Sequence, residues 1–397
     1  MSERGEHEGP FDELFKIFGS LRSGPGSQPI SLATARMTAT ELATGGVPEP
    51  NVEPTRRMEL EEVGRAAALE AATALGIERA AGVRVVCGTR AQWVDRVLGD
   101  IGTFVRSLAE HLVQSVGEPE PHHSDGGDTE ALLRGWLRMM APVQLGAMVG
   151  GTVGRVARRA FGDADLYLPR RVSTELMLVA ANIGEFGRAW SIPEPDLHYW
   201  VCLEQICTYA IVQLEHVSEV MRDGIGSSLV RFRMAGAERL ADRLARHLQD
   251  FDPDDVEGRR ELSLRVSDAS SILEGPLGPE PPEVTRMRAV RAAIAGHVDW
   301  VVEKVIKRMI PGWARIDEAA KRRLIEHTPE HLTATVLGVQ PTRDDLAAGR
   351  SFVEGILDRT DESALRKLWS SRDALPTPAE IEAPGLWIAR MELRHSD

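Results

Sequence analysis

Three polar side chains interrupt an apolar stretch of the sequence, and their types and spacing could do chemistry. Glu204 and Thr208 are one helical turn apart, so on a helix they share a face on which a carboxylate and a hydroxyl could weakly hold a cation. Gln205 follows Glu204 directly and adds an amide. Burial of a lone carboxylate costs on the order of several kcal/mol, so Glu204 requires a partner. The alternative is a core helix whose polar cluster is satisfied internally.

The element that must position these residues is predicted to be one long, buried helix. The stretch from Pro193 to Arg222 has prolines only at its entrance, where a missing N–H costs nothing. No Gly or Pro follows from Tyr199 to Met221, and apolar residues cover nearly every side. A helix that is apolar all round belongs in a core.

The segment WVCLEQICT at Trp200–Thr208 resembles the helix W-V-x-L-H-E-x-x-H of a bacterial family of zincin-like hydrolases. Members of that family are described as zinc-dependent metalloproteases, and some as associated with deazaflavin-coenzyme biosynthesis. The resemblance extends in the same order over nearly the whole chain. It includes PFDELFKIFG, NVEP (Asn51–Pro54), GDADLYLPR (Gly162–Arg170), IAGHVDWVVEKV (Ile294–Val305) and GRSFVEGI (Gly349–Ile356). It implies a zincin-like, mainly α, multi-helix fold with a long buried central helix and little β structure.

The chemistry that the resemblance implies depends on positions at which this chain differs. In H-E-x-x-H, two histidines one turn apart bind zinc, and the glutamate is the general base for the metal-bound water. Those positions hold Glu204, Gln205 and Thr208 here, and the position of the expected third ligand holds Ala295. An amide cannot act as a base at neutral pH, and threonine is a poor zinc ligand. We therefore expect no catalytic residue, no metal and no cofactor, and predict a non-catalytic binding or regulatory member of a peptidase family.

The remaining polar positions of the family pattern are expected to line a cleft. The helix predicted over Pro282–Met309 carries His297, which by the resemblance could pair with Glu204. The alternative is a hydrogen bond from His297 to the main chain. Arg343 begins a segment that corresponds to R-Q-Y-x-x-G in the family. The expected cleft residues are Glu204, Gln205, Thr208, His297 and Arg343.

An enzyme with a relocated site is the second hypothesis. His198 and Cys202 are one turn apart on the predicted central helix. Glu204, His216 and His297 could join them as the metal site of a hydrolase or peptidase. This arrangement requires ligands from two faces of one helix.

Composition limits the partners and the compartment. The net charge of −13 argues against nonspecific binding to nucleic acid, which needs clustered basic residues. The three cysteines form no disulfide framework, so we expect a reduced, cytoplasmic protein with thiols in its core. We expect no secretory signal at the polar N-terminus and no membrane span, because the apolar segment Ala141–Val156 is too short and glycine-rich. The expected partner is a peptide or protein, and the oligomeric state stays open.

Residues 1–50 are expected to form an N-terminal extension and residues 51–397 the helical domain. The length of that domain allows two lobes, of about 51–190 and 191–397.

Local patterns predict how the helices pack and where the few strands lie. Val83–Cys87 and Asp165–Leu168 are the two predicted strands, and Arg171–Trp190 is predicted to be helical. Glycines recur at every fourth position at Gly146, Gly150 and Gly154, a pattern that predicts close contact between helices in the core.

Overall fold

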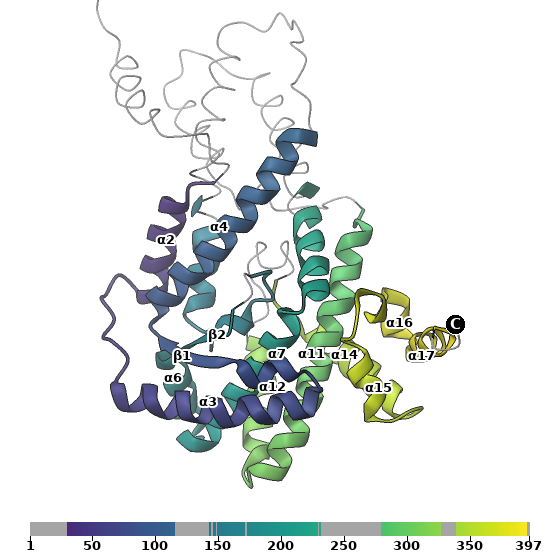
Figure 1. Cartoon of the computed structure of the whole chain (residues 1–397). Helices are drawn as coiled ribbons and strands as arrows, with labels where there is room; N and C mark the ends of the chain where they lie inside the picture. Colours follow the sequence, from purple (N-terminus) through teal and green to yellow (C-terminus); the bar gives the residue numbers. More distant parts are fainter. Residues whose placement is uncertain are drawn as a thin grey trace, which may run out of the picture.

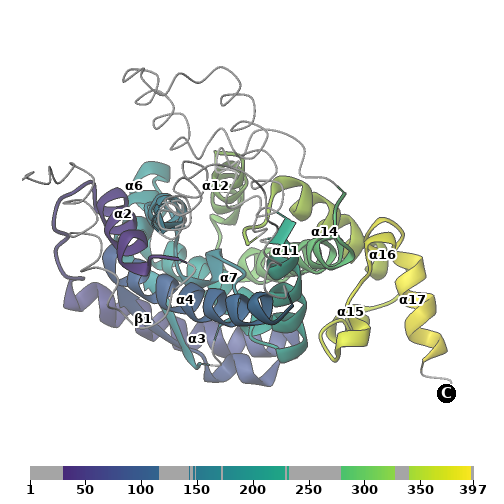
Figure 2. The same cartoon turned by 90° about the horizontal axis from the view of Figure 1, so that it is seen from above.

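The computed structural model describes residues 30–115, 149–170, 173–228, 279–326 and 339–394, together with positions 143, 146, 147, 230 and 231. This part of the chain is mainly α-helical, as the sequence predicts, and its two strands form one pair (Figures 1 and 2). The labelled helices are α2 (Leu32–Thr44), α3 (Pro54–Leu75), α4 (Arg90–Ser115), α6 (Ala180–Trp190), α7 (Glu194–Val212), α11 (Pro282–Met309), α12 (Trp313–Glu326), α14 (Arg343–Leu357), α15 (Glu362–Lys367), α16 (Pro378–Glu382) and α17 (Pro384–Leu393). Residues 149–157 and 215–228 are also helical. The strands are β1 (Arg84–Gly88) and β2 (Glu175–Val179), and short 3-10 turns are η1 (Glu78–Gly82), η2 (Asp163–Asp165) and η3 (Arg372–Ala374).

Helix α7 is the predicted central helix, and the rest of the described chain packs around it. It contacts α3 on one side and α11 on another, and Figure 1 shows it in the middle of the molecule. Between Leu197 and Val212 only Tyr199 and Glu204 are not buried. The near absence of a polar face in the sequence therefore predicted its burial correctly.

The central helix is shorter than the sequence predicts. We expected it to continue to about Arg222, but α7 ends at Val212 and a second helix begins at residue 215. The carbonyl oxygen of Gln213 accepts a hydrogen bond from Arg79 Nη1 at 2.7 Å. This long-range contact satisfies a carbonyl at the break, which no local glycine or proline marks.

The strand prediction was correct for one strand and wrong for the other. Strand β1 lies where it was expected and pairs in parallel with β2, with Cys87 opposite Leu178. Asp165 instead closes the turn η2, and the pairing partner comes from the start of a segment predicted to be helical. In that segment the helix begins only at Ala180, because the five residues before it are drawn into the ladder with β1.

The glycine repeat marks close helix packing, as predicted. A Cβ atom added to Gly146 would lie 2.4 Å from the carbonyl oxygen of Ser31, and one at Gly150 would lie 2.4 Å from that of Ala35. At Gly154 the corresponding distance to Ala39 is 2.6 Å. Helix α2, whose alanines 35, 39 and 43 are buried, is thus part of the core.

The three cysteines are free thiols, and two of them lie in the core. Cys202 and Cys207 are buried free thiols, as expected, and Cys87 is a half-buried free thiol. Among the described helices, none combines the length and apolar character that crossing a bilayer would require.

Helices α11 and α14 cross at a pair of glycines. A Cβ atom added to Gly349 would lie 1.9 Å from the carbonyl oxygen of Ala292, and one added to Gly296 would lie 2.0 Å from the backbone of Gly349. Next to the crossing, Arg291 and Asp345 form a buried, two-pronged ion pair with N–O distances of 3.0 and 3.2 Å. The backbones therefore touch, and the crossing fixes how α14 and the C-terminal helices beside it in Figure 2 are placed.

We predict that Gly349→Ala lowers the free energy of unfolding by about 3 kcal/mol or more, because the helices must separate to admit the methyl group. Urea unfolding followed by circular dichroism measures the change. Gly99→Ala is the matched control, because Gly99 also lies inside a helix but has no atom within 4 Å of an added Cβ. Equal stability of the two variants would contradict the backbone contact.

Candidate functional site

The amide of Gln205 joins helix α7 to the turn η2. Its Oε1 atom accepts a hydrogen bond from the backbone N–H of Ala164 at 3.1 Å, and its Nε2 donates to Asp165 Oδ1 at 2.9 Å. The other oxygen of Asp165 accepts from Arg323 Nη2 of α12 at 3.0 Å and from the backbone N–H of Phe161. Gln205 is buried, and both ends of its side chain are satisfied by the turn.

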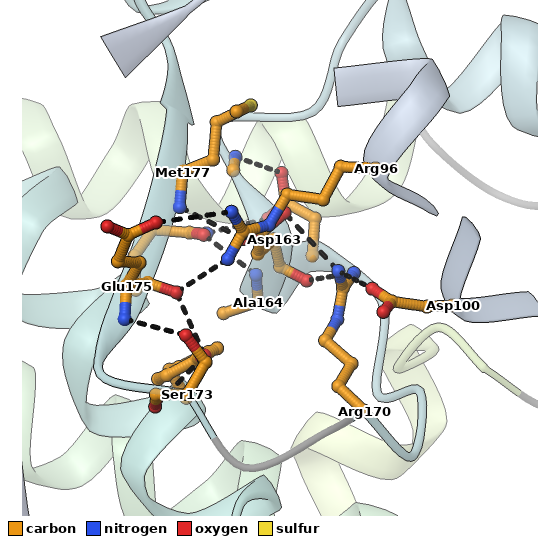
Figure 3. A network of polar contacts seen from close by, with 12 residues as sticks. Arg96, Asp100, Asp163, Ala164, Arg170, Ser173, Glu175 and Met177 are labelled. Atoms are coloured by element: carbon orange, nitrogen blue, oxygen red, sulfur yellow. Dashed lines mark hydrogen bonds and ion pairs between the residues drawn. The ribbon is translucent and has the colours of Figure 1, made fainter. Parts of the chain in front are cut away.

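The same turn is held from its other side by a buried charge. Asp163 is fully buried and lies between two arginines: Arg96 Nε of α4 at 2.9 Å and Arg170 Nη1 at 3.4 Å (Figure 3). Its Oδ2 also accepts from the backbone N–H of Met177 in β2 at 2.9 Å. Arg170 Nη1 also lies 2.6 Å from Asp100 Oδ2. Burial raises the pKa of Asp100, and the positive charge of Arg170 opposes this rise. The turn therefore connects β2, α4, α7 and α12.

Glu204 lies beside Gln205 but has no such partner. Its Oε2 atom is buried and has no hydrogen-bond partner. Burial raises the pKa of Glu204 to about 7; the nearby Arg323 opposes this rise, and the negative charges of Asp165 and Asp299 add to it. Asp299 of α11 has a pKa raised to about 6, also by burial, although Arg350 lies 3.1 Å away. One oxygen of this half-buried carboxylate thus has no partner in the protein, contrary to the reading of a fully satisfied core cluster.

His297 is turned toward the C-terminal segment. Its Nδ1 accepts a hydrogen bond from the indole N–H of Trp369 at 2.7 Å, so in the neutral ring the proton lies on Nε2. Burial alone lowers the pKa of His297 to about 4, and no charged group contributes to that shift. The partner is therefore an indole, rather than either Glu204 or the main chain as the sequence suggested.

The residues of the relocated-site hypothesis lie in different surroundings. His198 is near Glu194 and Glu59, and burial lowers its pKa. The thiol of Cys202 points to the carbonyl oxygen of Leu60 in α3, at 3.8 Å. His216 lies near Trp369 and Glu219 instead. Over the residues that the structure describes, no three or more His, Cys, Asp or Glu side chains gather into a group that could hold a metal ion.

Comparison with known families identifies the scaffold. The sequence pattern of the zincin-like metallopeptidase family matches residues 30–388. The chain belongs to this family. No curated protein matches it.

The fold of this family member has a counterpart among solved structures. It is similar to the crystal structure of a protein from Chloroflexus aurantiacus described as "a putative hydrolase with a novel fold". The TM-score is 0.59 at 17% sequence identity, and the match covers 91% of this chain and 99% of the other. At that identity the likeness establishes the fold alone.

Sequence reasoning missed the residues that organise the site around the family's helix. Arg343, one of the expected cleft residues, is exposed in the first turn of α14, and Asp345 of the same turn is buried against Arg291. Asp163 and Asp165 were noted only as part of a family segment. Their signal was the acid pair directly after Gly162, because acids so close together in an otherwise apolar segment require several donors.

We predict that Gln205→Glu lowers the free energy of unfolding at pH 7 by about 3 kcal/mol. The new carboxylate cannot donate to Asp165 and repels it in a buried place. Chemical denaturation measures the loss. Gln92→Glu is the control, because the exposed Gln92 only accepts a hydrogen bond, from the N–H of Thr89 at 3.0 Å, and a carboxylate keeps that bond. A comparably small effect of both variants would show that Gln205 does not hold the turn.

We predict that Glu204→Gln stabilises the protein in a pH-dependent way. The folded-state pKa of about 7 exceeds the ordinary 4.5, so ionisation of Glu204 opposes folding. The penalty is absent below pH 4.5, grows as the pH rises, and reaches about 3 kcal/mol above pH 7. Unfolding of both proteins at pH 4 and pH 8 measures it, and the exposed Glu215→Gln serves as control. A difference that does not change with pH would contradict the raised pKa of Glu204.

Proposed function

We propose that this chain is a non-catalytic member of the zincin-like metallopeptidase family that uses its scaffold to bind a peptide or protein partner. The observation that carries the proposal is the bonding of Gln205. By the resemblance, Gln205 stands at the position of the family's general base, and here its amide is engaged at both ends by Ala164 and Asp165. A side chain used in this way holds the turn in place, and its amide is too weak a base to take a proton from water at neutral pH.

The residues at the other family positions do not fit a zinc ion. Zinc in proteins is bound by thiolate sulfur, imidazole nitrogen or carboxylate oxygen, usually three or four ligands together. Glu204 offers one carboxylate, Thr208 a neutral hydroxyl and Ala295 a methyl group. His297, the histidine nearest to these positions in the family pattern, uses Nδ1 to accept from Trp369. This donor set supports a binding protein over a metallohydrolase.

The second hypothesis, a hydrolase with a relocated metal site, has less support. His198 and Cys202 face α3 and Glu59, whereas Glu204 is near Asp299 and Arg323. No contact in the described chain brings these two groups to one point.

We predict that protein purified without added zinc contains far less than one zinc per chain and cleaves no peptide in a chelator-sensitive way. Elemental analysis and an unbiased peptidase screen measure both properties. The variant Glu204→His/Thr208→His, which supplies two imidazoles one turn apart, is the positive control for zinc uptake.

One zinc per chain with cleavage that a chelator abolishes would overturn the proposed function. If that metal were lost in His198→Ala, the relocated site would be the explanation.

A further inference from the structure

One oxygen of the Glu204 carboxylate has no hydrogen-bond partner in the protein. Its Oε2 atom is enclosed by the protein and accepts no hydrogen bond, and an unpaired buried acceptor costs free energy, more so when it is charged. The neighbouring Gln205 cannot help, because both ends of its amide are bound to the turn η2. The stretch of α7 therefore has one acceptor without a protein partner at the position that corresponds, by the resemblance, to the family's first metal ligand.

The charged groups that face Glu204 leave an excess of negative charge. They are Asp165 from η2, Arg323 from α12 and Asp299 from α11. Arg323 is committed to Asp165 at 3.0 Å and lies over the ring of Phe161, with the guanidinium carbon 3.7 Å from the ring centre.

The basic partner of Asp299 is shared with other acids. Arg350 lies 3.1 Å from Asp299 and also contacts Glu303 and Glu354. The negative charges of Asp165 and Asp299 thus act on Glu204 while the nearest cations are already engaged, so an additional positive charge is attracted to its carboxylate.

The number of available acceptor atoms selects the kind of cation. Calcium takes six to eight oxygen ligands, and a guanidinium group is best matched by two parallel acceptors. Glu204 offers one unpartnered oxygen, and Asp165 has both of its oxygens in use. An ammonium group is a compact charge with three freely rotating donors, and one carboxylate oxygen with a nearby hydroxyl suits it. Thr208 supplies that hydroxyl one turn further along the same face of α7.

We propose that Glu204 binds an ammonium group of the partner, either a lysine side chain or the free N-terminus of a peptide. The inference rests on the proposed function, since it names the chemistry of the ligand that the non-catalytic scaffold takes. In place of a metal ion, the site then receives its positive charge from the bound molecule. Because the pKa of free Glu204 is about 7, a lysine ammonium binds more tightly at pH 8 than at pH 6, where Glu204 must first release a proton.

Three immobilised libraries of random decapeptides test the proposal with the full-length protein. The first has acetylated N-termini and one central lysine, the second has free N-termini and no lysine, and the third has acetylated N-termini with acetyl-lysine in the centre. We expect at least tenfold greater retention on the first or the second library than on the third at pH 7, and for the lysine library a greater difference at pH 8 than at pH 6. Which of the two is retained identifies the source of the ammonium group.

Glu204→Gln should abolish the preference, and Glu215→Gln should keep it; the first variant is expected to fold at least as stably as the natural protein. Equal retention on all three libraries, or an unchanged preference in Glu204→Gln, would overturn the ammonium site and leave the binding function standing. Retention on none of them would overturn both the site and the peptide partner. Zinc-dependent cleavage in the assay described above would contradict the proposed function separately.

Discussion

The structure depends on a three-residue turn, Asp163–Asp165, at which parts of the chain far apart in sequence are joined. A fully buried carboxylate at Asp163 is balanced by Arg96 and Arg170, and removing either partner would leave a charge in the core. The turn also has no space to shift, since a Cβ atom at Gly162 would lie 2.6 Å from the carbonyl oxygen of Met177 and 2.7 Å from Gln205 Oε1. Strand β2, helix α4, helix α7 and helix α12 are therefore placed relative to one another by polar contacts at one point.

This constraint explains why adjacent residues of α7 have opposite roles. Gln205 points into the turn, where a neutral amide that both donates and accepts matches a backbone N–H and a carboxylate. A charged residue would fit that place poorly, because Asp163 and Asp165 already bring two negative charges. Glu204 is displaced by about 100° around the helix and faces α11 and α12 instead. Its charge is tolerated there only with a raised pKa, which indicates that the folded chain alone does not satisfy it.

Whether the sequence could predict a feature depends on how close together in the chain the residues that form it lie. The start of α7 and the burial of its sides follow from a local pattern of residue types, and both were predicted correctly. The end of α7 depends on Arg79, and the bond of His297 depends on Trp369, 72 positions away. Neither is encoded in a short pattern. The unpaired state of Glu204 was also out of reach, since it depends on Arg323 being already bound to Asp165.

The negative charges near Glu204 of α7 can be understood by comparison with a site that holds a metal ion. In a site built around a zinc ion, nearby carboxylates are offset by the two positive charges of the metal. In this chain the negative charges of Asp165 and Asp299 act on a third acid, Glu204 of α7, and the nearby Arg323 offsets them only in part. Were the site an inert relic, substitution by a neutral residue would be more stable and equally compatible with the packing. An acid that weakens the fold is best understood when a positively charged ligand restores the balance, because its cost in the free protein then becomes affinity in the complex.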